Sequence, residues 1–241
     1  MNVEFAVVVP VCNEAENVEP LAREIAAAMT GRAYEMIFID DGSTDETAMI
    51  LMRLKASLPP LRVLRHSFRS GQSAAVASGV RAAKAPWVAT LDGDGQNDPA
   101  DIPNLIAARD LPENRSVQLF MGNRTASRKD TAYRRLQSRV ANGVRSGLLG
   151  DGTPDTGCGI KLFLRDTFME LPRFDHMHRF LPALFQRQGA RVISVPVSHR
   201  ERTRGTSKYG MFNRLWVGIV DIIGVMWLRR RYKPGLLVRE E

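Results

Sequence analysis

The fold is decided by the stretch Thr90–Pro99, which reads TLDGDGQNDP. Asp92 and Asp94 are separated by one glycine and directly follow the apolar run Trp87–Ala89, which is typical of a buried strand. Two neighbouring carboxylates repel one another unless a cation neutralises them. Mg²⁺ and Mn²⁺ prefer oxygen ligands, and one or two carboxylates often hold them together with substrate phosphates. The stretch therefore predicts a metal site formed by Asp92, Asp94 and the amide oxygen of Gln96.

Two other interpretations of this stretch compete with the metal site. An EF-hand calcium loop requires Gly at its sixth position and Glu at its twelfth. Those positions hold Asn97 and Pro103, so the calcium-loop interpretation fails. A plain Asp-Gly turn remains possible from local sequence alone. The placement directly after a strand favours the metal site.

Outward from this stretch, apolar runs alternate with segments of helical spacing. The expected strands are Phe5–Val11, Tyr34–Ile39, Leu61–Leu64, Trp87–Leu91 and Val117–Met121. The expected helices are Glu14–Met29, Thr44–Leu58, Gly71–Ala83 and Pro99–Ala108. This alternation predicts βαβ units, and hence an α/β fold with a mostly parallel central sheet flanked by helices.

Polar clusters follow three of these strands, at the sheet edge where ligands of parallel sheets bind. They are Cys12–Glu14, Asp40–Ser43 and Asp92–Asp94. Ser43 or Asp45 can cap the next helix, but capping does not account for both Asp40 and Asp41. A carboxylate at Asp41 could accept hydrogen bonds from a ribose hydroxyl or a base N–H.

The second half of the chain is less regular. We expect helices at Thr131–Leu149, His176–Gln188 and Met211–Leu228, strands at Ile160–Leu164 and Val192–Val197, and loops at Gly150–Gly159 and Arg200–Gly210. No clean linker separates these segments. The sequence therefore favours one domain with a C-terminal appendage.

The charge is distributed unevenly along the chain. The first 123 residues hold 11 Lys or Arg and 16 Asp or Glu, a net charge of −5, whereas residues 124–241 hold 23 and 10, a net charge of +13. A basic second half suits nucleic acid, a membrane surface or phosphorylated substrates, although a solvated basic face is the simpler alternative. The N-terminus has no signal-peptide pattern, and the distant Cys12 and Cys158 frame neither a metal site nor a disulfide network, so we expect a cytoplasmic protein.

Four stretches together resemble a known family. They are VVVPVCNEAENV at residues 7–18, IFIDDGSTDET at 37–47, ATLDGDGQNDP at 89–99 and RTRGTSKYG at 202–210. In this order they resemble the inverting family 2 glycosyltransferases of the GT-A fold, closest to the dolichol-phosphate mannosyltransferase and polyprenyl-phosphate glycosyltransferase group. The resemblance implies a glycosyltransferase domain at residues 1–210, with a nucleotide-sugar-binding half at 1–125 and an acceptor-binding half at 126–210.

The resemblance also implies roles for individual residues. The donor nucleotide sugar, GDP- or UDP-linked, would contact Pro10, Cys12, Glu14, Ile39, Asp41, Asp92, Gly93, Asp94, Arg124, Arg202 and Lys208. The DxD motif at Asp92–Asp94, with Gln96 nearby, would bind Mg²⁺ or Mn²⁺. The catalytic group would comprise Asp94, Asp155, Arg202 and Lys208.

The chain departs from the family pattern at two places. The acceptor-side stretch, usually D-x-x-G-S-F-R, reads DTGCGIKLF at Asp155–Phe163, so Lys161 replaces the arginine. Cys12 stands where the family commonly has an aromatic residue. The role of Asp155, as a weak base or as a group that positions the acceptor, therefore stays open, as does the identity of the sugar.

The expected mechanism follows from the charge that develops during transfer. Negative charge builds on the departing nucleoside diphosphate, where the metal, Arg202 and Lys208 would stabilise it. A sugar hydroxyl acceptor would need a general base. A lipid phosphate is already anionic at neutral pH, since its second pKa is about 6, so positioning and cationic groups could suffice.

The C-terminal segment at residues 211–241 indicates what kind of partner the protein binds. Leu215–Leu228 is apolar except for Asp221 and two glycines, and 14 residues of helix rise only about 21 Å, too short for a bilayer core of about 30 Å. Trp216, Trp227, the cluster Arg229–Arg231 and Lys233 suit an amphipathic helix on an anionic membrane surface. The alternatives are a helix packed on the sheet or a homodimer interface, and a separate membrane protein is a further possible partner.

We therefore predict a metal-dependent transferase that moves a sugar from a nucleotide sugar to a polyprenyl phosphate, peripherally bound at the inner face of the membrane. One rival has the same donor chemistry but a saccharide or another lipid as acceptor. A nucleic-acid-binding module is disfavoured because the aromatic platforms and recognition helix of such modules are missing from the pattern. A nucleotidyltransferase would need a glycine-rich loop after the first strand, where the sequence reads VPVCNEAEN.

Overall fold

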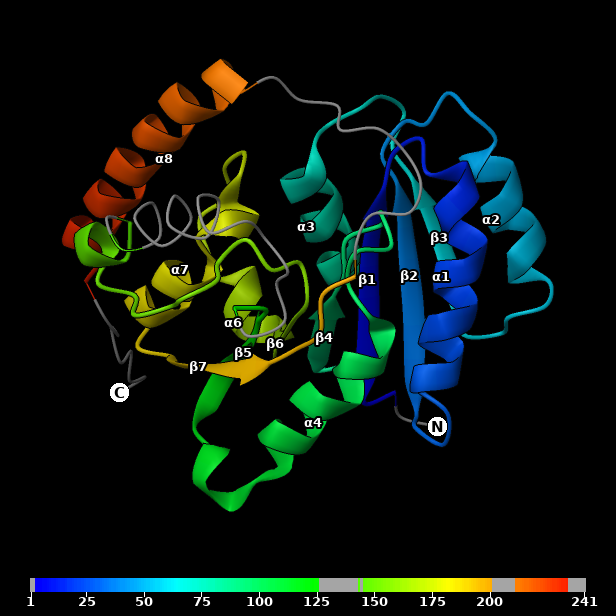
Figure 1. Ribbon diagram of the computed structural model, residues 1–241, viewed down its shortest axis with the longest axis horizontal. Coiled ribbons are helices and arrows are strands. Elements are labelled where there is room, and N and C mark those ends of the chain that lie inside the picture. Colours follow the sequence, from blue (N-terminus) through cyan, green and yellow to red (C-terminus); the bar gives the residue numbers. More distant parts are fainter. Residues whose placement is uncertain (1–2, 126–142, 144, 201–210, 234–241) are drawn as a thin grey trace, which may run out of the picture.

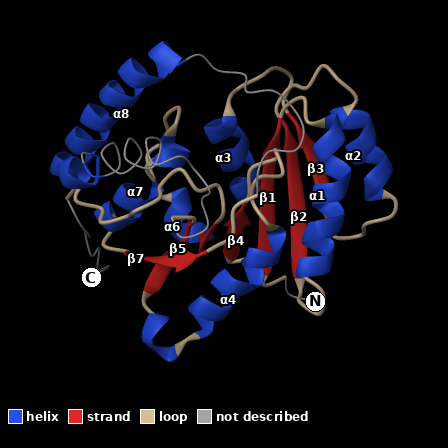
Figure 2. Ribbon diagram, viewed as in Figure 1, coloured by secondary structure: helices blue, strands red, loops and turns tan. Residues whose placement is uncertain are grey.

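The computed structural model describes residues 3–125, 143, 145–200 and 211–233, with side chains from residue 217 onward in the last range. Its centre is a seven-stranded sheet of order β3-β2-β1-β4-β6-β5-β7. Figure 2 shows the strands in red between the helices. The strands are parallel except β6, which pairs antiparallel with both β4 and β5. This arrangement confirms the expected α/β fold.

The elements alternate along the chain (Figure 1). The strands are β1 (Phe5–Val11), β2 (Tyr34–Asp40), β3 (Leu61–Arg65), β4 (Trp87–Thr90), β5 (Val117–Asn123), β6 (Lys161–Leu164) and β7 (Arg191–Pro196). The α-helices are α1 (Ala15–Ala28), α2 (Thr47–Lys55), α3 (Gln72–Ala82), α4 (Ile102–Asp110), α6 (Arg165–Met169), α7 (Leu181–Arg187) and α8 (Met211–Arg231). Short 3₁₀ turns occupy Pro99–Asp101, Pro112–Asn114 and Met177–Arg179.

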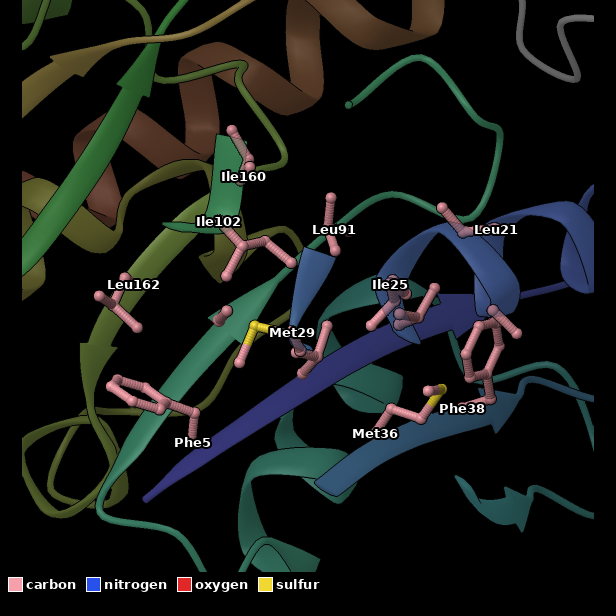
Figure 3. Packing of buried hydrophobic residues seen from close by; sticks show 14 of the residues in the cluster. Phe5, Leu21, Ile25, Met29, Met36, Phe38, Leu91, Ile102, Ile160 and Leu162 are labelled. Atoms are coloured by element: carbon pink, nitrogen blue, oxygen red, sulfur yellow. The ribbon is translucent and has the colours of Figure 1, made fainter. Parts of the chain in front are cut away.

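Two hydrophobic clusters cover the two faces of the sheet. One packs the strands against α1, α2 and α4 and includes Phe5, Ile25 and Phe38 (Figure 3). The other packs them against α3, α6, α7 and α8 and includes Phe163 and Phe185, whose rings meet edge to face at 5.8 Å. Side chains of β1 alternate between the two clusters, as expected for a strand buried on both faces.

Two local predictions were wrong, and one short helix was not predicted. The expected helix His176–Gln188 is a 3₁₀ turn followed by α7, because His176 has a φ of +63° and Pro182 fits only in the first turn of a helix. The expected helix at Thr44 begins at Thr47. Its N-terminal carboxylate is Asp45, which accepts from the Thr47 main-chain N–H at 3.0 Å. The short helix α6 was not foreseen, and most of the expected helix Thr131–Leu149 lies outside the described residues.

Helix α8 lies on the outside of the molecule next to α7 and away from α1 and α2 (Figure 1). Its inner side is attached by buried Val225 and by a hydrogen bond from Arg187 Nε to the Leu228 carbonyl oxygen at 3.1 Å. Its outer side exposes Val220, Ile223 and Trp227, at 63%, 61% and 59%. The helix therefore has an apolar side facing out, and its inner side is apolar as well at Val225. Among the described helices, none is both long and apolar enough to cross a bilayer.

Candidate active site

The strand order places the predicted polar clusters side by side. Strands β2, β1 and β4 are adjacent and parallel, so their C-terminal ends share one edge of the sheet. Cys12, Asp41 and Asp92 each follow one of these strands. The sheet thus brings the three clusters to a common edge, as expected.

The loop after β4 is shaped by close contacts with its neighbours. A Cβ on Gly93 would lie 2.6 Å from Val11 Cγ1 and 2.8 Å from the Pro10 carbonyl oxygen, so only glycine fits there. The Asp92 main-chain N–H donates to Asn97 Oδ1 at 3.1 Å, and the Gln96 main-chain N–H donates to Asp94 Oδ1 at 3.1 Å. These bonds fold the DxD stretch back on itself at the end of β4.

Asp92 lies in a strongly perturbed environment. Burial first, and then the charge of Asp94, raise the pKa of Asp92 above its ordinary value, while the cations of Lys161 and Arg124 and a hydrogen bond from Gln72 oppose the rise. Gln72 Nε2 donates to Asp92 Oδ1 at 2.7 Å. A carboxylate in this state is stabilised by an added cation, because the cation offsets both causes of the shift.

The donor set fits a cation shared with a substrate. No cluster of three or more His, Cys, Asp or Glu side chains capable of holding a metal occurs within the described parts of the chain. Two carboxylates with further oxygens from a diphosphate make a normal site for Mg²⁺ or Mn²⁺. Asp92 and Asp94 would hold such an ion, and the side chain of Gln96 is half-buried in the same loop.

Gly159, in the stretch Asp155–Phe163, packs closely against this loop. A Cβ there would lie 2.2 Å from Asp92 Oδ2 and 2.4 Å from Asn97 Oδ1. The Gly159 carbonyl oxygen accepts from Thr90 Oγ1 at 2.9 Å. Gly159 belongs to the stretch that departs from the family pattern, and nothing in its sequence context indicates that it lies close to Asp92.

Arg124 and Asp155, both predicted site residues, form a buried ion pair. Arg124 Nε donates to Asp155 Oδ2 at 2.9 Å, Arg124 Nη2 donates to Oδ1 at 3.0 Å, and the Arg124 main-chain N–H donates to Oδ2 at 3.1 Å. Burial alone would lower the pKa of Arg124, but the bonds and charge of Asp155 raise it above its ordinary value. Asp155 thus holds Arg124 near the DxD loop.

Lys161 is also buried at this edge. It opens β6 opposite Thr90, and its Nζ donates to the Cys158 carbonyl oxygen. Burial lowers the pKa of Lys161 despite the opposing charges of Cys158, Asp92 and Asp155. Lys161 stands at the position where the family pattern has an arginine. In the structure its charge acts on Asp92.

The end of β1 is tied to the turn after β2. The Asn13 main-chain N–H donates to Ser43 Oγ at 2.9 Å, and Glu14 Oε2 accepts from Asn17 Nδ2 at 2.7 Å. Cys12 is partly exposed between these segments. The expected capping role of Ser43 is therefore replaced by a contact between two neighbouring loops.

Asp40 and Asp41 differ in their surroundings. Asp40 is fully buried, accepts from the Ser43 main-chain N–H at 2.9 Å and pairs with Arg65 Nε at 3.1 Å, so its role is structural. Asp41 accepts from the main-chain N–H groups of Ser70 and Gly71, each at 2.8 Å, and its Oδ1 lies 2.7 Å from His66 Nδ1. A carboxylate has about four acceptor positions, so the predicted bond to a nucleotide would use the remaining one.

One predicted residue faces away from this edge, and two others lie outside the described residues. Ile39 is fully buried and packs under α3, where a Cβ on Gly79 would lie 2.6 Å from its Cδ1. Arg202 and Lys208 lie outside the described residues. Their predicted roles stay predictions.

A cavity of about 510 Å³ opens beside Asp92 on the α3 side of the sheet. Its lining comes from the ends of β1 and β4, the start of α3, Arg145, the 156–161 stretch, the segment at 178–181 and α8. His178 lies in this lining, with its Nδ1 2.7 Å from Ser73 Oγ. Sequence reasoning missed His178 because it lay within an expected helix and belonged to none of the four motifs.

Comparison with known proteins identifies the family. The family model described as "Glycosyl transferase family 2" matches residues 6–171. A dodecaprenyl-phosphate galacturonate synthase from Rhizobium johnstonii is 34% identical over 97% of this chain and 70% of its own length. An undecaprenyl-phosphate 4-deoxy-4-formamido-L-arabinose transferase from Edwardsiella ictaluri is 35% identical over 86% of this chain and 63% of its own length.

Solved structures share the fold at lower identity. Glucosyl-3-phosphoglycerate synthase from Mycobacterium tuberculosis, in complex with Mn²⁺, UDP and its product, has a TM-score of 0.69 and 20% identity, and the match covers 94% of this chain and 80% of that protein. A mannosyltransferase from Pyrobaculum calidifontis with GDP-mannose and Mn²⁺ has a TM-score of 0.65 and 18% identity, over 98% and 66%. These neighbours confirm the GT-A fold.

The conclusion rests on the length of the family match and on the identity to named transferases over nearly the whole chain. The predicted resemblance is therefore confirmed. This chain belongs to glycosyl transferase family 2 and is a glycosyltransferase.

Proposed function

We propose that the protein transfers a sugar, with inversion, from a nucleoside-diphosphate sugar to a polyprenyl phosphate. The supporting observation is that two named relatives differ in their sugar but agree in an acceptor of this type. Because the sugars differ, the acceptor class is the part of their chemistry that we extend to this chain. Asp92 beside the cations of Lys161 and Arg124 suits a reaction between two phosphate-bearing substrates.

Asp92 and Asp94 would hold Mg²⁺ or Mn²⁺ together with the donor's diphosphate. The cation supplies neutralisation of the charge that develops on the departing nucleoside diphosphate. Arg124, fixed by Asp155, adds a cationic group to this edge of the sheet. The acceptor phosphate needs no strong base, since it is already anionic at neutral pH.

The same proposal places the protein peripherally at the inner face of the cytoplasmic membrane. The outer side of α8 exposes Val220, Ile223 and Trp227, and Arg229–Arg231 follow at the end of the helix. Apolar side chains next to arginines suit a bilayer interface with anionic headgroups. The side chain of Trp216, predicted to contribute, lies outside the described residues.

The test is transfer of radiolabelled sugar with Mg²⁺ or Mn²⁺. A panel of UDP- and GDP-sugars would be offered with undecaprenyl phosphate or with a saccharide acceptor. We expect label in the lipid fraction only. Label on the saccharide alone would favour the rival acceptor class.

A matched pair of variants tests the metal site in the same assay. Asp94→Ala should reduce turnover by about a hundredfold or more, since a transition-state charge loses its stabilisation. Asp166→Ala, whose side chain is 94% exposed on α6, should leave turnover unchanged. Equal turnover of the two variants would remove Asp94 from the mechanism.

A further inference from the structure

The cavity beside Asp92 continues to the C-terminal helix. Asp92, Lys161 and His178 line it, and so do Gly218 and Ile222 of α8. One cavity therefore has the predicted donor site in its lining and the helix with the exposed apolar side in its wall. A ligand could therefore enter the cavity from the side of the molecule that α8 covers.

The charged side chains in the cavity lining differ in whether a side chain of opposite charge already pairs with them. Arg145 is neutralised by Asp151, and Asp221 lies 3.1 Å from His176 Nδ1. Lys161 Nζ uses one of its three donors on the Cys158 carbonyl oxygen. Arg179 is exposed, and no carboxylate in the described ranges pairs with it. Among the described lining residues, Lys161 and Arg179 are thus the cations open to a ligand.

The tautomer of His178 is set by Ser73. The His178 main-chain N–H donates to Ser73 Oγ at 3.3 Å, and the same oxygen lies 2.7 Å from His178 Nδ1. Because Ser73 Oγ already accepts this main-chain N–H, we infer that its hydroxyl is the donor to Nδ1. The proton of the neutral ring then sits on Nε2.

The ring stays neutral in this setting. Burial, and then the charges of Lys161, Arg179 and His176, lower the pKa of His178 to about 3. A neutral ring with its proton on Nε2 is a hydrogen-bond donor at every pH near neutrality. Its Nδ1 is occupied by Ser73, so His178 is not available there as a base.

We propose that this cavity binds the monophosphate of the prenyl acceptor, with Lys161 and Arg179 as its cations and His178 Nε2–H as a fixed donor. The inference rests on the proposed function and adds the residues that recognise the acceptor. Cations combined with an N–H donor are the groups that bind phosphate oxygens. The prenyl chain would leave the cavity along α8.

The first experiment is a calorimetric titration with geranyl phosphate, geraniol and inorganic phosphate, without donor. We expect geranyl phosphate to bind, inorganic phosphate to bind more weakly, and geraniol not to bind. His178→Asn and Arg179→Gln should weaken the binding of geranyl phosphate by about tenfold to a hundredfold, since a bond to a charged group is lost. His178→Gln, whose amide N–H can replace Nε2–H, should restore most of the affinity.

Controls separate binding from folding. Arg173→Gln changes an exposed arginine whose guanidinium contacts Met169, and it should bind geranyl phosphate like the unmodified protein. Each variant's urea midpoint shows whether it folds. Unchanged affinity for geranyl phosphate in folded His178→Asn and Arg179→Gln would overturn the proposal.

Steady-state kinetics of sugar transfer show whether the cavity binds the acceptor or the sugar of the donor. We expect a raised KM for the prenyl phosphate and an unchanged KM for the nucleotide sugar in His178→Asn. The reverse pattern would assign the cavity to the sugar of the donor and overturn the inference while leaving the proposed function intact. No transfer to any prenyl phosphate by the unmodified protein would refute the proposed function, and the titration would still decide whether the cavity binds a phosphate.

Discussion

Asp155 accepts three hydrogen bonds from Arg124, two from the guanidinium and one from the main-chain N–H. Both side chains are buried, at 3% and 8% exposure. A carboxylate held in this way is suited to fixing a cation, and its oxygens are poorly placed to take a proton from an acceptor. The geometry therefore favours positioning over base catalysis among the two roles predicted for Asp155.

Asp155→Asn should destabilise the fold as well as slow transfer. Breaking a buried ion pair leaves an uncompensated charge and costs about 3–5 kcal/mol. Urea unfolding would measure the loss, and a double-mutant cycle with Arg124→Gln should show that the second substitution costs much less than the first. Lost turnover with an unchanged free energy of unfolding would instead indicate a base.

Gly159→Ala should displace the Asp92 carboxylate, because the new Cβ would lie 2.2 Å from Asp92 Oδ2. We expect turnover to fall by about tenfold to a hundredfold, as for a misplaced group near the reaction. Gly147→Ala is the matched control, since no atom lies within 4 Å of the Cβ that it would add. Similar turnover in both variants would contradict the assigned role of Gly159.

The outer side of α8 should control membrane binding. Trp227→Ser removes an aromatic side chain that is 59% exposed, and should weaken the binding of the protein to vesicles containing anionic lipid in a sedimentation assay. Met52→Ser on α2, also 59% exposed, is the control and should bind as before. If both variants sediment like the unmodified protein, α8 is not the membrane contact.

The stability of the fold should fall in mild acid through His178. Its pKa is lowered to about 3, whereas an unfolded histidine titrates near 6.5. Below about pH 6.5 the unfolded chain takes up a proton that the folded chain does not. Unfolding then becomes easier by up to about 1.4 kcal/mol per pH unit from this group.

This pH effect can be isolated with a variant. His178→Gln lacks the titrating group, so its free energy of unfolding should decline less steeply between pH 7 and pH 5 than that of the unmodified protein. Urea unfolding at several pH values measures both slopes. Parallel slopes would show that His178 is protonated in the folded state.

The first half of the fold was predictable because its strands are buried on both faces. Runs such as Phe5–Val11 leave little choice but a central strand, and the clusters after them then share an edge by topology alone. The second half was less predictable, because pairing partners are not encoded locally. Nothing in the four residues Lys161–Leu164 shows that they run antiparallel between β4 and β5.

The candidate site was predictable where motifs are contiguous and unpredictable where contacts join distant segments. Asp92 and Asp94 can be recognised from the sequence because they belong to one contiguous motif. The hydrogen-bond partners of Asp41, in contrast, come from the turn at residues 66–71. The hydrogen bond between His178 and Ser73 joins residues 105 positions apart. No periodicity or motif links such pairs, so only the folded chain reveals them.

One side of helix α8 lines the cavity, and another side exposes apolar residues. The two sides are separated by the diameter of one helix, about 10 Å. With that outer side resting on lipid, the reacting phosphate would lie at headgroup depth. A very hydrophobic substrate would then never have to be extracted into water: its tail stays dissolved in the bilayer while its polar end crosses the thickness of a single helix.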